Sequence, residues 1–167
     1  MDLIGDYIKR WDEFRFETGA LEALKTICEM GLEIILISNQ AGVGDGVFSE
    51  SSLWEIHDRM LGELKKKGIR IRDTQYCLHG KEAACECRKP ETGLLKKAVE
   101  GIRYDPEKTF MIGDKVSDME AGRRFGIKTI LVRTGFGRDA EKELIGERKP
   151  DYVVEDLTEA VKILKKV

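Results

Sequence analysis

Apolar residues along the chain alternate between two spacings, and this alternation predicts strands separated by helices. Apolar side chains recur three and four positions apart over residues 20–30 and 52–67, which is the spacing of amphipathic helices. Short aliphatic runs, typical of strands covered on both faces, lie between the helical stretches. The expected strands are 32–37, 74–77, 109–112, 129–132 and 152–154, and further helices are expected over 92–100, 117–125, 139–146 and 157–166. This order predicts an α/β fold with a Rossmann-like, doubly wound parallel sheet.

Small residues mark the ends of the first two predicted helices. Gly31 and Gly68 follow these helices directly, as C-cap glycines do. Ser52 and Glu55 have the spacing of a capping box, in which serine and glutamate side chains satisfy backbone amides of the first turn. We therefore expect the second helix to be capped by Ser52.

The first 17 residues depart from the alternating pattern. They contain no aliphatic run and place aromatic residues among charged ones, namely Tyr7, Trp11, Phe14 and Phe16. We expect an irregular lead-in rather than a strand. Neither internal repeats nor low-complexity linkers interrupt the remaining sequence, so residues 1–167 are expected to form a single domain.

Charge and hydropathy exclude two classes of partner. Charged residues make up 36% of the chain, and mixed signs give a formal net charge of −2. Without a basic excess, no electrostatic footprint for nucleic acid is expected. Neither an apolar stretch of about 18 residues nor a secretory leader is found, so we expect a cytoplasmic protein without a membrane partner.

Three of the four cysteines gather in a short segment with a histidine. The segment supplies three thiolates and one imidazole within eleven positions, as Cys77, His79, Cys85 and Cys87. Soft ligands of this kind select zinc, and four protein ligands leave no open position on a tetrahedral ion. The cluster predicts a structural zinc site that stiffens the adjoining loop, and the alternatives are unliganded thiols or a disulfide.

Polar residues follow two of the predicted strands, at the sheet edge where ligands of open parallel sheets bind. Ser38, Asn39 and Gln40 follow the first strand, where a hydroxyl and turn amides could receive an anion. Taken alone, such a triplet is more often turn chemistry. Asp114, after Gly113, is either a turn residue or the ligand of a hard cation such as Mg²⁺.

Two further positions carry charge at helix starts. Arg88 and Lys89 precede the helix expected over 92–100 and suit a phosphate group, although a basic pair is usually only surface. Asp118 lies in the first turn of the helix over 117–125, where a carboxylate favours the helix dipole. A capping role explains Asp118 without any ligand.

Taken in order, three of these segments resemble signatures of the haloacid dehalogenase-like phosphatases. They are Ser-Asn-Gln at 38–40, Cys-x-His-x₅-Cys-x-Cys-Arg-Lys-Pro at 77–90 and Gly-Asp-Lys-x-x-Asp-Met-Glu-Ala-Gly at 113–122. The likeness covers nearly the whole chain. It is greatest to the branch with a zinc loop, which contains heptose 1,7-bisphosphate phosphatases and histidinol-phosphate phosphatases. The resemblance implies a fold without a separate cap domain and the Mg²⁺-dependent removal of phosphate from a small phosphorylated metabolite in carbohydrate metabolism.

The resemblance also implies roles for the polar positions. Ser38 and Lys89 would hold the transferring phosphoryl group, and Asp114 would bind Mg²⁺. The whole phosphate- and substrate-binding set implied by the family comprises Ser38, Asn39, Gln40, Arg88, Lys89 and Lys115. Residues 5–16 resemble the segment that lies on the substrate side of the family's first strand.

One signature of the family is absent from the sequence. The family begins with a central strand ending in Asp-x-Asp-Gly, whose first aspartate attacks phosphorus and whose second is general acid and base. Here Asp2 and Asp6 are four positions apart, and no strand pattern precedes Asp2. We therefore expect that this chain contains no catalytic residue and that the motif lies upstream of Met1. Without the nucleophile, the chain is expected to be inactive. A central strand at Met1–Ile4 that turned Asp6 toward Asp114 would instead place the motif within the chain.

A missing central strand has a structural consequence. The strands on either side of it should pair directly, enclose a strand from another segment or chain, or leave an apolar groove. We expect a monomer, or a dimer if a second chain supplies the strand.

Three functions of different class fit these observations: a phosphatase whose nucleophile lies upstream, a non-catalytic relative that binds a phosphorylated ligand or partner, and a zinc-stabilised interaction domain. Among phosphatases, Gly-Asp-Lys favours the heptose branch, whereas the short spacer between His79 and Cys85 favours the histidinol-phosphate branch. We expect a sugar bisphosphate as substrate.

Overall fold

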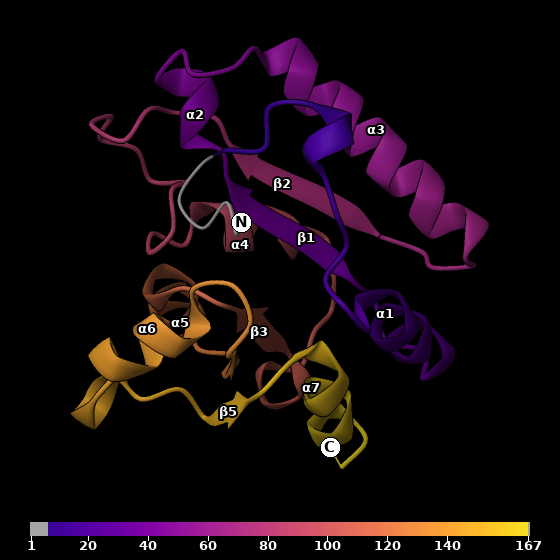
Figure 1. Cartoon of the computed structure of the whole chain (residues 1–167). Helices are drawn as coiled ribbons and strands as arrows, with labels where there is room; N and C mark the ends of the chain where they lie inside the picture. Colours follow the sequence, from indigo (N-terminus) through magenta and orange to yellow (C-terminus); the bar gives the residue numbers. More distant parts are fainter. Residues whose placement is uncertain (1–6, 167) are drawn as a thin grey trace. The chain divides into compact units, whose positions relative to one another are not determined.

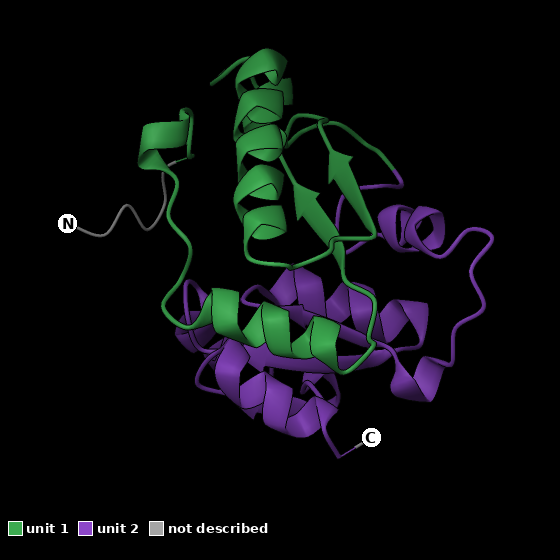
Figure 2. Ribbon diagram, turned by 90° about the vertical axis from the view of Figure 1, so that its right-hand side faces the viewer, with its two compact units in different colours: residues 1–85 green, residues 86–167 purple. Residues whose placement is uncertain are grey.

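A computed structural model of the chain describes residues 7–166, which form two compact units. The first unit ends at Cys85 and the second begins at Glu86, as Figure 2 shows in green and purple. Every strand pairing in the described residues is parallel. The α/β class predicted from the hydrophobic pattern is confirmed, while the single domain stays a prediction.

The first unit carries a two-stranded parallel sheet with helices around it. Its elements are η1 (Trp11–Glu13), α1 (Ala20–Glu29), β1 (Ile35–Asn39), α2 (Ala41–Gly44), α3 (Glu50–Lys66) and β2 (Asp73–Cys77). The register of β1 and β2 places Asn39 opposite Cys77. Helix α3 lies along β2 in Figure 1, and the ring of Tyr76 in β2 packs 5.8 Å from Trp54 and 5.6 Å from His57 of that helix.

The second unit carries a three-stranded parallel sheet in the order β3-β4-β5. Its elements are α4 (Gly93–Ala98), η2 (Pro106–Lys108), β3 (Phe110–Gly113), α5 (Val116–Phe125), β4 (Lys128–Val132), α6 (Gly137–Glu143), η3 (Gly146–Arg148), β5 (Tyr152–Val154) and α7 (Leu157–Leu164). The middle strand β4 is the most buried, because Ile130 and Leu131 are fully enclosed. A core cluster of Met119, Leu131, Ala140 and Leu144 joins this strand to α5 and α6.

The predicted strands and helices are present with shifts of one to a few residues at their ends. The first strand, expected at 32–37, lies at Ile35–Asn39, so that Ser38 and Asn39 are its last two residues. The expectation that this strand is covered on both faces is wrong, since each of its residues is only half-buried. In the part of the chain that the structure describes, β2 is its one ladder partner.

Helix α3 begins one turn earlier than the capping pattern suggested. Ser49 is the N-cap residue, and its Oγ accepts a hydrogen bond of 3.1 Å from the amide of Ser52. The predicted cap at Ser52 is therefore wrong, because Ser52 already lies in the first helical turn. The predicted helix ends are confirmed: Gly31 and Gly68 both have φ of +76°, a conformation that glycine adopts without steric cost.

The described part of the N-terminal segment is the expected irregular lead-in with one short 3₁₀ turn, η1. The rings of Trp11 and Phe14 stack 5.1 Å apart, and those of Phe14 and Phe16 meet edge to face at 4.9 Å. A central strand at Met1–Ile4 lies outside the described residues. Within residues 7–166, β1 and β3 belong to different sheets, and the three arrangements expected around a missing strand stay predictions.

The helices of residues 7–166 are all too short or too polar to cross a bilayer.

Candidate functional site

The four predicted metal ligands gather on one loop. The Sγ atom of Cys77 lies 3.6 Å from Nδ1 of His79 and 3.7 Å from Sγ of Cys85. With Cys87 included, the ligand atoms lie within 4.8 Å of one another. Zinc bonds of about 2.0–2.3 Å make the edges of a tetrahedron about 3.5–3.8 Å long, so the spacing suits one zinc ion. No disulfide links any of the four cysteines, so the disulfide alternative is wrong.

The loop begins at the same sheet edge as the predicted anion-binding triplet. Cys77 is the last residue of β2 and is fully buried, and its carbonyl oxygen accepts a hydrogen bond of 2.8 Å from the amide of Gln40. The side-chain amide of Gln40 donates to Oγ of Ser38 at 3.0 Å. Because the Ser38 oxygen is the acceptor there, its own proton stays available to donate to an anionic oxygen.

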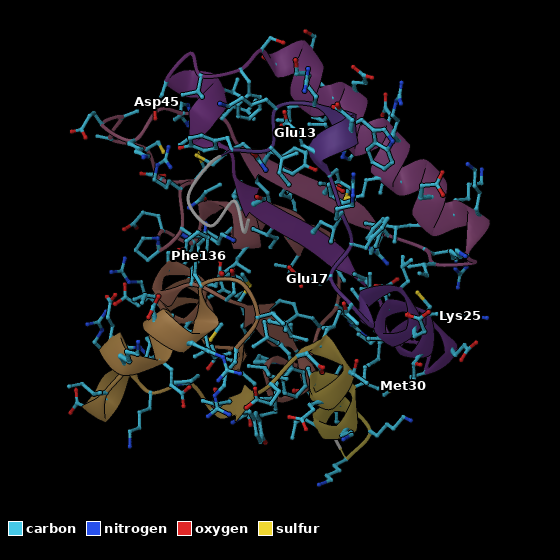
Figure 3. The ribbon with its side chains drawn as sticks, in the orientation of Figure 1. Glu13, Glu17, Lys25, Met30, Asp45 and Phe136 are labelled. Atoms are coloured by element: carbon cyan, nitrogen blue, oxygen red, sulfur yellow. The ribbon has the colours of Figure 1, made fainter. Side chains whose placement is uncertain are left out.

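Two glycines allow the loop that carries the four predicted metal ligands (residues 77–87, the metal loop) to lie directly against the segment that follows Gln40. A Cβ atom at Gly44 would collide with the backbone of residues 78–80, and one at Gly80 would collide with the carboxylate of Asp45. Asp45 instead accepts a hydrogen bond of 2.9 Å from the amide of Lys81 (Figure 3). The loop is therefore braced against α2, the helix next to the predicted phosphate-binding turn.

Replacing Gly44 by alanine should destabilise the protein by about 1–3 kcal/mol, because the new methyl group meets backbone atoms that cannot swing aside. Urea unfolding and the bound zinc content would measure the effect. The matched control is Gly62→Ala in α3, where a Cβ meets open space and should stabilise the helix by about 0.5–1 kcal/mol. Equal responses of the two variants would contradict this packing.

In the second unit, Lys89 and Asp118 form a buried ion pair at the end of β3. Nζ of Lys89 lies 2.5 Å from Oδ1 of Asp118, and their side chains are only 8% and 6% exposed. The other oxygen, Oδ2, accepts a hydrogen bond of 3.1 Å from the amide of Lys115 at the start of α5. Gly113 is required beside this carboxylate, because a Cβ there would collide with it.

Asp118 is therefore a candidate site residue that the sequence reasoning missed. Its predicted capping role is confirmed, and the pairing with Lys89 is a second role. The available signal was the Gly-Asp-Lys-x-x-Asp segment, in which this aspartate follows Asp114 by four positions. The carboxylate holds the Lys89 ammonium in one place, which is what a point charge for a phosphate needs.

Asp114 is held by the loop that follows β4. Its Oδ2 accepts a hydrogen bond of 3.0 Å from the amide of Phe136, and a Cβ at Gly135 would collide with the same oxygen. No described residue donates a hydrogen bond to Oδ1, and carboxylate oxygens are ligands that a hard cation such as Mg²⁺ prefers. The next residue, Lys115, holds its ammonium 4.6 Å from the centre of the Phe136 ring.

Comparisons with known proteins decide the family. The HAD-hydrolase-like family model matches residues 86–160. The D-glycero-beta-D-manno-heptose-1,7-bisphosphate 7-phosphatase of Pasteurella multocida is 35% identical over 166 residues, which cover 95% of this chain and 88% of that protein. This chain belongs to the haloacid dehalogenase-like phosphatase family. The resemblance stated from the three sequence segments is thereby confirmed.

Two other relatives of this phosphatase-family chain bear on its branch. The crystal structure of a D,D-heptose 1,7-bisphosphate phosphatase from B. bronchiseptica, complexed with magnesium and phosphate, aligns with a TM-score of 0.89 and 29% identity, covering 96% of this chain and 89% of that one. The histidine biosynthesis bifunctional protein HisB of Campylobacter jejuni subsp. doylei is 31% identical over 134 residues, 80% of this chain and 38% of that protein. Both predicted branches of the family are thus among its relatives.

The structure arranges the predicted phosphatase residues in two groups. Ser38, Asn39 and Gln40 lie on the first unit, at the sheet edge where the metal loop starts. The second unit carries the remaining predicted residues, namely Arg88, Lys89, Asp114 and Lys115. The unit boundary falls inside the metal loop, between Cys85 and Cys87. The roles of both groups in binding one phosphate stay predictions.

Proposed function

We propose that this chain forms the phosphate- and metal-binding body of a Mg²⁺-dependent phosphomonoester hydrolase that acts on a sugar bisphosphate of the heptose 1,7-bisphosphate type. The observation that carries the proposal is the buried Lys89–Asp118 pair beside Asp114 at the carboxyl end of a parallel strand. A fixed cation and a carboxylate for Mg²⁺ at this edge suit a phosphoryl group. The heptose 1,7-bisphosphate phosphatases among its relatives support the substrate class.

Each residue of the chain has a defined task in this proposal. Lys89 provides a point charge for the phosphoryl oxygens, and Asp118 keeps its ammonium in place. Ser38 donates its hydroxyl proton to the same group, and Asp114 holds Mg²⁺. When bound, Mg²⁺ neutralises charge on the phosphoryl oxygens. The remaining substrate-binding positions are Asn39, Gln40, Arg88 and Lys115.

The nucleophile is the aspartate of an Asp-x-Asp-Gly strand, which these 167 residues do not contain. Its carboxylate attacks phosphorus in line, the ester oxygen leaves with a proton, and water later hydrolyses the aspartyl phosphate. Residues 1–167 alone then bind a phosphorylated metabolite without turning it over.

The Cys77, His79, Cys85 and Cys87 cluster holds one structural zinc ion in this proposal. Three thiolates and one imidazole fill the four positions of the ion, so no water can be activated there. The ion instead holds the loop that leads into Arg88 and Lys89. Cysteines that form no disulfide are typical of a reducing compartment, which supports a cytoplasmic location.

Phosphate release tests the proposal. The chain of 167 residues is compared with the same chain extended at its N-terminus by an aliphatic strand ending in Asp-x-Asp-Gly. We expect Mg²⁺-dependent phosphate release from heptose 1,7-bisphosphate by the extended chain only, with loss of turnover in its Asp114→Asn variant. Robust Mg²⁺-dependent release by residues 1–167 alone would show that the nucleophile has been misassigned.

Histidinol phosphate is the second candidate substrate, favoured by the HisB match and the short spacer between His79 and Cys85. The same assay distinguishes the two. Faster turnover of histidinol phosphate than of the heptose bisphosphate would assign the chain to the histidinol-phosphate phosphatase branch.

A further inference from the structure

Four charged residues form a connected series of ion pairs at α6 in the second unit. Arg133 donates from Nε and Nη2 to the two carboxylate oxygens of Glu141, each at 2.7 Å. Its Nη1 donates to Glu155 at 2.7 Å, and the other oxygen of Glu155 accepts from Arg138 at 2.8 Å. Hydrogen bonds to Arg133 hold the pKa of Glu141 below its usual range, so the pair stays charged. A bidentate fork of this kind fixes orientation as well as distance.

The network joins the start of α6 to the ends of two strands. Arg133 directly follows β4 and Glu155 directly follows β5, whereas Arg138 and Glu141 lie on α6. The backbone of Arg133 is also held, since its amide donates to the carbonyl of Val154 at 2.9 Å. The contacts to Arg133 after β4 and to Glu155 after β5 therefore fix the orientation of α6 and of the short turn that leads into it.

Phe136 is the residue through which this turn reaches the proposed phosphatase site. It is the N-cap residue of α6, its amide donates to Asp114, and its ring faces the ammonium of Lys115 (Figure 3). The residues on either side of Phe136 are tightly packed. A Cβ at Gly137 would collide with the carbonyl oxygen of Val132, just as one at Gly135 would collide with Asp114.

We propose that Arg133 and Glu141 are positioning residues of the phosphatase site, which act through Phe136 to hold the carboxylate of Asp114 and the ammonium of Lys115. The inference rests on the proposed function for the roles of Asp114 and Lys115. The Arg133 and Glu141 side chains are 29% and 37% exposed, so solvent screens part of their attraction, while the bidentate geometry still fixes how the pair is oriented. The Arg133–Glu141 ion pair acts by keeping the Asp114 carboxylate oriented toward a cation.

The test uses the ¹⁵N-labelled chain of 167 residues, titrated with Mg²⁺ and followed at the Phe136 and Lys115 amides. Arg133→Met and Glu141→Gln should each weaken Mg²⁺ binding about tenfold, within the range for lost outer support of a metal ligand. Hydrogen exchange at the Phe136 amide should become faster by a larger factor than the change in global stability, measured by urea unfolding, accounts for. Arg133→Lys keeps the charge but not the bidentate fork, so it should restore only part of the affinity.

The control is the Arg148–Glu120 pair, which has a 2.7 Å contact on the same unit and does not involve Asp114 or Phe136. Arg148→Met should leave Mg²⁺ affinity and Phe136 exchange unchanged. If Asp114→Asn binds Mg²⁺ as well as the parent chain, the proposed function fails. If Asp114→Asn abolishes binding while Arg133→Met and Glu141→Gln match the parent chain in affinity and Phe136 exchange, the positioning role is wrong. Should the parent chain bind no Mg²⁺, Phe136 exchange alone decides the positioning role.

Discussion

Replacing Lys89 by methionine should lower the free energy of unfolding by about 3–5 kcal/mol, because the change leaves the Asp118 carboxylate buried without its cation. The two side chains are 8% and 6% exposed and meet at 2.5 Å, so solvent cannot take over the role of the ammonium. The proposed function adds a second effect, since the phosphoryl group also loses its point charge. Urea unfolding at neutral pH measures the first effect, and titration with inorganic phosphate measures the second.

Two further variants separate burial from charge. Adding Asp118→Asn to Lys89→Met removes the stranded charge and should recover much of the lost stability. Arg124 pairs with Glu91 at 2.8 Å in the same unit, but these side chains are 45% and 54% exposed. Arg124→Met should therefore change stability by about 0–1 kcal/mol. If Lys89→Met lowered the free energy of unfolding no more than Arg124→Met does, the buried Lys89–Asp118 pair would not be important for stability.

Replacing Cys77 by serine should release the zinc ion and destabilise the protein by several kcal/mol. Binding of a structural zinc ion supplies about 10–16 kcal/mol of apparent free energy in small zinc-dependent domains. Cys77 is fully buried at the end of β2 and lies within 3.7 Å of two other ligands, so its thiolate is central to the cluster. Metal analysis of the parent chain should give about one zinc per molecule. Unfolding with and without a chelator measures the contribution to stability.

Cys28 is the matched control for the zinc variant. It lies on α1 outside the cluster, and its Sγ donates to the carbonyl oxygen of Arg70 at 3.6 Å, a contact that a serine hydroxyl can keep. Cys28→Ser should retain its zinc and respond to chelator as the parent chain does, whereas Cys77→Ser should not respond. Almost no zinc in protein prepared without chelator would refute the assignment of this cluster.

Local patterns by themselves determined most of the secondary structure and the metal cluster. Apolar spacing located the strands that end at Asn39 and Gly113, because burial of one face or two imposes a period that is visible within each element. The cluster of three cysteines and one histidine was found for a similar reason. All four lie within eleven residues of one loop, so their spacing alone brings soft ligands within reach of one ion.

Only the tertiary structure decided which distant residues meet. Asp118 pairs with Lys89 across a helix and a strand, and Asp114 accepts from the amide of Phe136, 22 positions later. These contacts depend on the pairing of β3 with β4 and on the packing of α5 and α6, which no local period records. The same holds at the start of α3, where the spacing of Ser52 and Glu55 predicted a cap at Ser52 and the N-cap residue is Ser49.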